Sequence, residues 1–187
     1  MPFIKTGFPD LLIFEPKVFE DHRGYFFESY NQQLFLDNDV QINFVQDNQA
    51  KSSYGILRGL HFQQDPYAQT KLIRAISGEI LDVAVDLRKG SPTYGKAYTI
   101  ILSAENRKQL LVPKGFAHGY SVLSETAEVM YKCDAFYHKS SEGGISWNDP
   151  QLSIDWKIPA DKVIVSEKDS VLKGLEDTEI NFVFNAG

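Results

Sequence analysis

The sequence has little cysteine, no long apolar run and no excess of positive charge, and each shortage excludes a class of protein. Cys133 is the only cysteine among 187 residues, so no disulfide forms within the chain, and this fits a reducing cytoplasm. We expect its thiol to be a small buried hydrophobe. No apolar run approaches the ~18 residues of a membrane span, and residues 1–5 lack the pattern of a signal peptide.

The balance of charge argues against a general nucleic-acid binder. Lysine and arginine together number 19 against 25 acidic residues, which gives a formal net charge of -6. One phosphorylated small molecule would need only a few local cations. The candidates for that role are Arg23, Arg58, Lys71, Arg74 and Lys168.

Short strands dominate the predicted secondary structure, as in residues 80–88. Strand alternation puts aliphatic side chains at positions 81, 83, 85 and 87 on one face, and Asp82, Ala84 and Asp86 on the other. Similar short runs lie at 24–30, 42–46, 71–76, 98–102, 109–112, 119–123 and 128–137. Only two short helices are predicted, at 31–36 with Asn31 as N-cap and at 170–174. These patterns indicate one all-β domain, a sandwich or a barrel, without choosing between them.

Two tyrosines stand an even number of positions apart on the strand predicted at 128–137. Tyr131 and Tyr137 would then point the same way, separated by roughly 20 Å along a regular strand. Such a pair could serve opposite ends of one long ligand, or line the interior of a barrel.

Two separated motifs resemble the two-part signature of cupin barrels. The first is Gly55-Ile56-Leu57-Arg58-Gly59-Leu60-His61-Phe62-Gln63, and the second is Pro113-Lys114-Gly115-Phe116-Ala117-His118. Metal-binding cupins have His-x-His in the first motif, followed by a carboxylate. Here the second position is Gln63, whose amide binds divalent transition metals poorly. The pattern favours a cupin scaffold used for metal-free chemistry.

The order of several further blocks resembles the dTDP-4-dehydrorhamnose 3,5-epimerase family, from about Phe14 to Asp169. The blocks are Asp21-His22-Arg23-Gly24-Tyr25-Phe26-Phe27-Glu28, Gln46-Asp47-Asn48, residues 53–63, residues 82–88, residues 91–95, Pro113 to Gly119, Tyr131-Lys132, Tyr137, Asn148-Asp149-Pro150 and Ser166-Glu167-Lys168-Asp169.

This resemblance implies a fold, a reaction and partners. The fold would be a jelly-roll cupin with a few short helices, a single domain over residues 1–187 whose C-terminal helical segment begins at about 169. The protein would be a cytoplasmic homodimer, with N-terminal strands that can be exchanged between subunits. It would need no metal or organic cofactor, and would bind neither nucleic acid nor membrane. The substrate would be a dTDP-sugar, dTDP-4-dehydro-6-deoxy-D-glucose, inverted at C3 and C5.

The resemblance also implies residue roles that suit the chemistry. Both inverted carbons flank the C4 ketone, so the enzyme needs a base, an acid on the opposite face and a donor at O4. His61 matches the base, Asp169 the carboxylate that orients it, Tyr131 the proton donor and Lys71 the O4 stabiliser. The matching substrate-binding positions are Arg23, Phe26, Glu28, Gln46, Asp47, Asn48, Arg58, Lys71, His118, Tyr137, Glu142 and Lys168.

Alternatives remain open at this point. Relatives on the same scaffold invert one centre only, or move the ketone from C4 to C3; a metal-dependent cupin and a non-catalytic binding module are further candidates. Asp169 would by itself be read as the N-cap of the short helix after it. Arg58 and His61 are an odd number of residues apart, so both reach one ligand only if the strand bends, and Gly59 is the predicted place.

Overall fold

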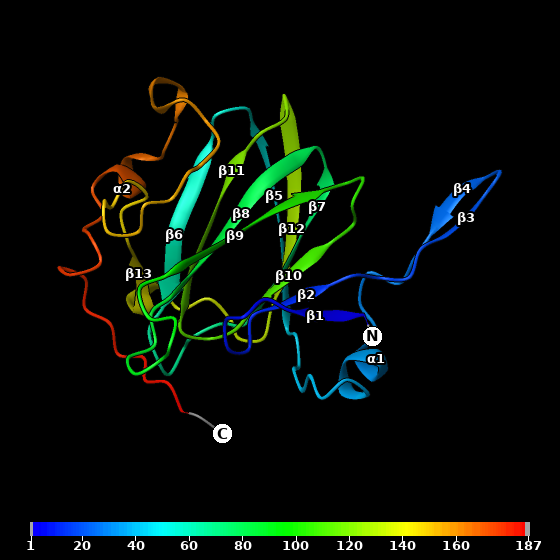
Figure 1. Ribbon diagram of the computed structural model, residues 1–187, viewed down its shortest axis with the longest axis horizontal. Coiled ribbons are helices and arrows are strands. Elements are labelled where there is room, and N and C mark those ends of the chain that lie inside the picture. The colour runs from blue at the N-terminus through cyan, green and yellow to red at the C-terminus, as the bar shows by residue number, and fades with distance from the viewer. Residues whose placement is uncertain (1, 186–187) are drawn as a thin grey trace.

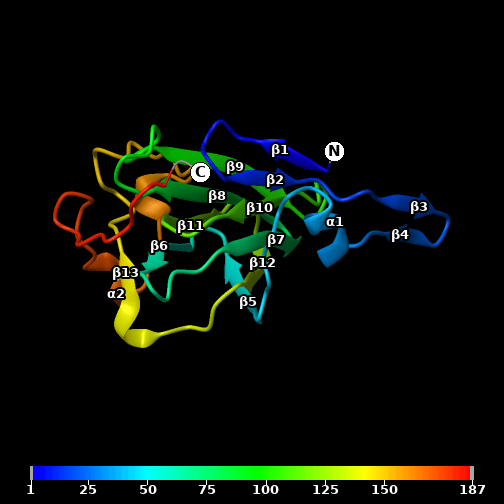
Figure 2. The same cartoon turned by 90° about the horizontal axis from the view of Figure 1, so that it is seen from below.

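The computed structural model describes residues 2–185, which form two facing antiparallel sheets and a projecting hairpin (Figures 1 and 2). The first sheet has six strands in the order β1 (Phe3–Lys5), β2 (Leu12–Phe14), β10 (Gln109–Val112), β7 (Lys71–Ser77), β12 (Thr126–Cys133) and β5 (Gln46–Ser53). The second has five, in the order β13 (Glu142–Gly144), β6 (Leu57–Gln63), β11 (Phe116–Val122), β8 (Glu79–Asp86) and β9 (Ala97–Ser103). This arrangement confirms the all-β jelly-roll prediction.

Three smaller features lie outside the two sheets. Strands β3 (Phe19–Asp21) and β4 (Gly24–Phe26) form a hairpin that stands away from the body at the right of Figure 1. Helix α1 (Gln32–Leu36) begins at the predicted cap, because Asn31 accepts a hydrogen bond from the Leu34 amide. Helix α2 (Glu167–Ser170) lies beside the second sheet, and two 3₁₀ turns occupy Lys139–Ser141 and Ala160–Lys162. No helix in the described part of the chain is long and apolar enough to cross a membrane.

Four predicted boundaries are wrong. The strand expected at 42–46 begins only at Gln46, the strand expected at 24–30 ends at Phe26, and the strand expected at 128–137 ends at Cys133. Tyr137 therefore lies in a loop. The C-terminal helix spans Glu167–Ser170 rather than 170–174, because Ser166 is its N-cap.

Strand β8 is buried on both faces, and its apolar face points out of the barrel. Leu81, Val83 and Val85 belong to a cluster completed by the C-terminal part of the chain, including Trp156 and Phe182. Figure 1 shows this part of the chain, in orange and red, passing along the outside of the second sheet. The opposite face of β8 looks into the barrel, where Ala84 joins the core between the sheets. Because the C-terminal segment covers the apolar face, the interior can hold polar groups such as Asp82.

A buried ion pair at the end of β8 is linked to the N-terminal segment. Asp86 is fully buried and accepts hydrogen bonds from Arg88, at Nε with 3.0 Å and at Nη2 with 2.9 Å, and from Ser91 and Thr93. Arg88 also binds Asp10 at 2.8 Å near the N-terminus. This network satisfies charges that would be costly to bury alone.

Replacing Asp86 with alanine is expected to destabilise the fold by roughly 3–5 kcal/mol, because Arg88 stays buried with only the exposed Asp10 as a charged partner. Asp155 is a matched control: it binds the amide and ammonium of Lys157 with the same two-residue spacing, but both side chains are exposed. Asp155→Ala is expected to have no measurable effect on the free energy of unfolding. Urea unfolding of both variants checks this, and equal losses would contradict it.

Candidate active site

Two adjoining cavities form one cleft at the open end of the barrel. The inner cavity has a volume of about 410 Å³ and is lined by residues of β6, β11 and the segment 164–169. The neighbouring cavity, called the outer cavity below, has a volume of about 380 Å³. It is lined by β5, by the end of β6 and by Tyr137 and Glu142. His61, Lys71 and Tyr131 line both cavities. Three of the four predicted catalytic side chains thus lie where the two cavities meet, and the fourth, Asp169, lines the inner cavity.

His61 is held by a buried carboxylate. Its Nε2 lies 2.7 Å from Oδ1 of Asp169, and the second carboxylate oxygen accepts the Gly59 amide at 3.4 Å. Asp169 is 4% exposed and lies inside helix α2, where its own amide donates to Ser166 Oγ; its expected role as N-cap is wrong. With Nε2 engaged, Nδ1 is the ring nitrogen left for a ligand.

Burial sets the protonation of His61. It lowers the pKa of His61 below the usual 6.5, although the Asp169 carboxylate acts in the opposite direction. The imidazole is therefore neutral at pH 7, as a general base must be.

A bend in β6 brings Arg58 and His61 to the same cleft, as predicted. Gly59 has a φ of +129°, and the pairing of β6 with β11 shifts register between His118 and Tyr120. A Cβ at Gly59 would lie 2.6 Å from the Gly119 Cα, so only glycine fits. Both Arg58 and His61 line the inner cavity.

Lys71 and Tyr131 face His61 from the other sheet. They lie on the neighbouring strands β7 and β12, with the Lys71 ammonium 5.9 Å from the centre of the Tyr131 ring. Burial raises the pKa of Tyr131, so its phenol stays protonated and can donate. Burial also lowers the pKa of Lys71, whose amino group enters the cleft as a hydrogen-bond donor.

A second imidazole–carboxylate pair lies next to His61 in the same sheet. His118 is paired with His61 across the β6–β11 ladder, and its Nε2 lies 2.8 Å from Oδ1 of Asp82. Asp82 is fully buried, and its Oδ2 has no hydrogen-bond partner in the described structure. Sequence reasoning placed His118 in the site but missed Asp82 and Tyr120. Strand alternation could have predicted Tyr120, because it lies two residues after His118 and so shares the inward face of the same strand.

The outer cavity is edged by a chain of polar contacts. Tyr137 Oη donates to Glu142 at 2.9 Å, and Glu142 forms an ion pair with Lys168. Although burial opposes it, the hydrogen bonds from Lys168 and Tyr137 lower the pKa of Glu142. Gln46 and Asn48 line the same cavity from β5.

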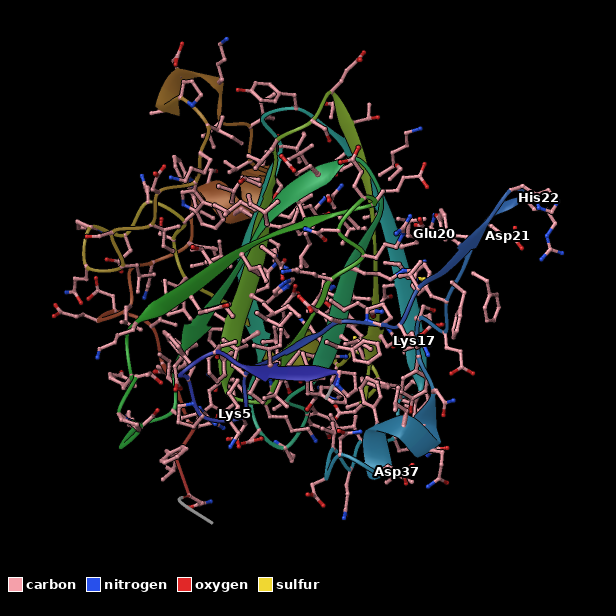
Figure 3. All side chains as sticks on the ribbon, turned by 45° about the vertical axis from the view of Figure 1, so that its right-hand side comes forward. Lys5, Lys17, Glu20, Asp21, His22 and Asp37 are labelled. Carbon is pink, nitrogen blue, oxygen red and sulfur yellow. The ribbon has the colours of Figure 1, made fainter. Side chains whose placement is uncertain are left out.

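The structure does not bring four predicted binding residues to this cleft. Asp47 lies on the opposite face of β5 and pairs with Lys132 at 2.9 Å. Arg23 and Phe26 are exposed on the projecting hairpin, where Arg23 binds Asp21, and Glu28 is exposed just after it. Figure 3 shows Glu20, Asp21 and His22 following the hairpin outward from the body. Within one subunit these residues are remote from His61.

The donors present do not form a metal site. Among residues 2–185, no three His, Cys, Asp or Glu side chains lie close enough together to hold a metal ion. At the position of the second histidine of a metal-binding cupin, Gln63 is bound at both ends of its amide to main-chain groups.

Comparison with known proteins identifies the family. The model of the dTDP-4-dehydrorhamnose 3,5-epimerase family matches residues 5–177. A curated protein of that name from Shigella flexneri is 54% identical over 170 residues, 90% of this chain and 93% of its own. The crystal structure of a dTDP-4-dehydrorhamnose 3,5-epimerase from Elizabethkingia anophelis NUHP1 is 55% identical with a TM-score of 0.90, covering 94% and 96% of the two chains. That of a dTDP-6-deoxy-D-glucose-3,5-epimerase from Legionella pneumophila Philadelphia 1, in complex with dTDP-4-keto-L-rhamnose, is 43% identical with a TM-score of 0.94 and covers 98% of each chain.

Proposed function

The chain belongs to the dTDP-4-dehydrorhamnose 3,5-epimerase family, and we propose that it converts dTDP-4-dehydro-6-deoxy-D-glucose to dTDP-4-dehydro-L-rhamnose in dTDP-L-rhamnose biosynthesis. The observation that carries the proposal is the set of His61, Asp169, Lys71 and Tyr131 in one cleft. These groups supply the base, its orienting carboxylate, a donor and an acid that inversion beside a ketone requires.

In the proposed mechanism, Nδ1 of His61 removes the proton from a carbon next to the C4 ketone. The neutral imidazole becomes an imidazolium, which the Asp169 carboxylate stabilises. The electron pair of the broken C–H bond moves to O4 and forms an enolate, and Lys71 donates a hydrogen bond to that oxygen. Tyr131 then delivers its phenolic proton to the opposite face of the carbon, which re-forms the ketone and inverts the centre. His61 next loses its added proton to solvent and the Tyr131 phenolate takes one up, so that the same pair can act at the second carbon. No step in this sequence needs a metal or an organic cofactor.

The nucleotide is proposed to extend across both cavities of the cleft. Arg58 and Lys168 would meet the pyrophosphate, and Tyr137 would stack on thymine. Gln46 and Asn48 would contact the nucleoside, with His118 and Glu142 as further binding groups. Asp47 has no part in this arrangement within its own subunit, since it faces away from the cleft and pairs with Lys132.

The hairpin residues fit this scheme only if a second subunit is present. We propose a homodimer of single-domain subunits in which the hairpin carries Arg23, Phe26 and Glu28 to the partner's cleft. In support, Phe19, Tyr25 and Phe26 are each more than half exposed on the hairpin, an apolar surface that a partner would cover. A cytoplasmic location fits the single free thiol of Cys133.

Proton exchange in D₂O tests the activity. The protein is expected to incorporate deuterium at both C3 and C5 of the 4-ketosugar nucleotide and to invert both centres, as read by NMR of the product. His61→Ala is expected to lower the rate by at least about 10³-fold, since the base is lost. Tyr131→Phe should reduce inversion, whereas Tyr94→Phe, on the surface away from the cleft, should not. Exchange at one centre alone would identify a single-centre epimerase, and movement of the ketone to C3 a ketoisomerase.

Mixed dimers test the role of the hairpin. Arg23→Ala alone is expected to lower kcat/KM roughly 10- to 100-fold, the effect of losing one hydrogen bond to a charged group. His61→Ala alone is expected to be inactive. Co-expressed with different tags and purified as a mixed pair, the two variants should recover activity, because one cleft then has both His61 and an intact partner hairpin. Mixed pairs no more active than Arg23→Ala dimers would show that the hairpin does not act across subunits.

A further inference from the structure

Gln63 is a buried amide that joins two loops at the outer end of the cleft. It lies at the end of β6 and is only 6% exposed. Its Nε2 donates to the carbonyl oxygen of Tyr67 at 2.9 Å, and its Oε1 accepts the amide of His138 at 2.6 Å. The side chain therefore bridges the main chains of the loop after β6 and the loop after β12.

The second of these loops carries Tyr137, the residue directly before His138. The His138 ring stacks on Tyr67, with centroids 3.7 Å apart and planes 2° from parallel. Tyr137 is itself exposed, and its amide makes only a long contact of 3.4 Å with Gln46. The Tyr137 ring is thus held at its hydroxyl by Glu142, and at its main chain by the adjacent peptide of His138.

We propose that Gln63 positions Tyr137 for the nucleotide base by fixing the amide of His138. This inference rests on the proposed function, in which Tyr137 stacks on thymine. An apolar residue at position 63 would leave the His138 N–H and the Tyr67 carbonyl without their partner, and the loop would move to satisfy them.

The catalytic groups are held by contacts that do not involve Gln63. His61 is fixed by Asp169, and Lys71 and Tyr131 are fixed by the ladder between β7 and β12. Loss of Gln63 should therefore weaken nucleotide binding while leaving the chemical step nearly intact.

The chain offers a matched control at the next residue. Gln64 has the same two-ended arrangement, donating to the Glu179 carbonyl and accepting the Asn181 amide, but it holds the C-terminal segment. Gln64 does not line either cavity of the cleft. Gln63→Met and Gln64→Met thus remove equivalent hydrogen bonds from different loops.

The measurements are the dissociation constant for dTDP by calorimetry and the steady-state kcat and KM for the 4-ketosugar nucleotide. Gln63→Met is expected to raise both the dissociation constant and KM on the order of tenfold, the equivalent of about one hydrogen bond. Its kcat should stay within about threefold of wild type, and Gln64→Met should change neither constant. In a Tyr137→Ala background, Gln63→Met should raise the dissociation constant for dTDP little further, because Gln63 acts through the Tyr137 ring.

A second variant, Gln63→Glu, distinguishes loss of the two hydrogen bonds from misfolding, because its effect should depend on pH. Gln63→Glu can make both hydrogen bonds only while its carboxyl is protonated, since the ionised form repels the Tyr67 carbonyl. The ratio of its KM to that of wild type should therefore rise with pH. Equal binding by wild type and Gln63→Met, full additivity with Tyr137→Ala, or a pH-independent ratio would overturn the proposal. Binding of dTDP needs no turnover, so this result is distinct from absence of epimerase activity in wild type.

Discussion

The contact between His61 and Asp169 is the interaction on which the rest of the site depends. It joins residues 108 positions apart and places a carboxylate that is almost fully buried against one nitrogen of a half-buried imidazole. Asp169 is held at its main-chain amide by Ser166, the N-cap of helix α2, and at its carboxylate by the Gly59 amide. Because Asp169 binds one ring nitrogen, the other is left for a ligand in the cleft, and the opposing sheet supplies Lys71 and Tyr131.

The polar groups inside the barrel depend on which way the two faces of strand β8 point. Strand β8 turns its aliphatic face outward, where the C-terminal segment covers it, and its polar face inward. Without that covering layer, the aliphatic face would have to be the inner one, and Asp82 could not reach His118. The C-terminal segment therefore does two things: it seals the outside of the barrel and carries Asp169 and Lys168 back to the cleft.

The sequence predicts the fold class well, because the relevant patterns are local, and it selects candidate catalytic residues that the structure brings together in one cleft. Alternation at 80–88 and the strand at 109–112 are confirmed, and Gly59 explains how Arg58 and His61 share one cleft. Strand β5 was missed for a physical reason: its inward residues are Gln46, Asn48, Ala50 and Ser52, so it carries no apolar alternation. The sequence predicts a strand at Tyr137 because nothing local shows where the chain leaves the sheet after Cys133. There the Gln69 side chain donates to the Ala135 carbonyl, and the Asp134 carboxylate accepts the Thr70 amide. The hairpin residues lie outside the cleft of this chain, and only the second subunit that we propose would bring them to one.

The most direct test of this account is the tautomer and titration of His61, measured by ¹⁵N-edited NMR of the imidazole ring. The account predicts a proton on Nε2, shared with Asp169, an unprotonated Nδ1, and a pKa below 6.5 that leaves the ring neutral at pH 7. A proton on Nδ1 in the neutral form, or a pKa above 6.5, would contradict the assignment of His61 as the base.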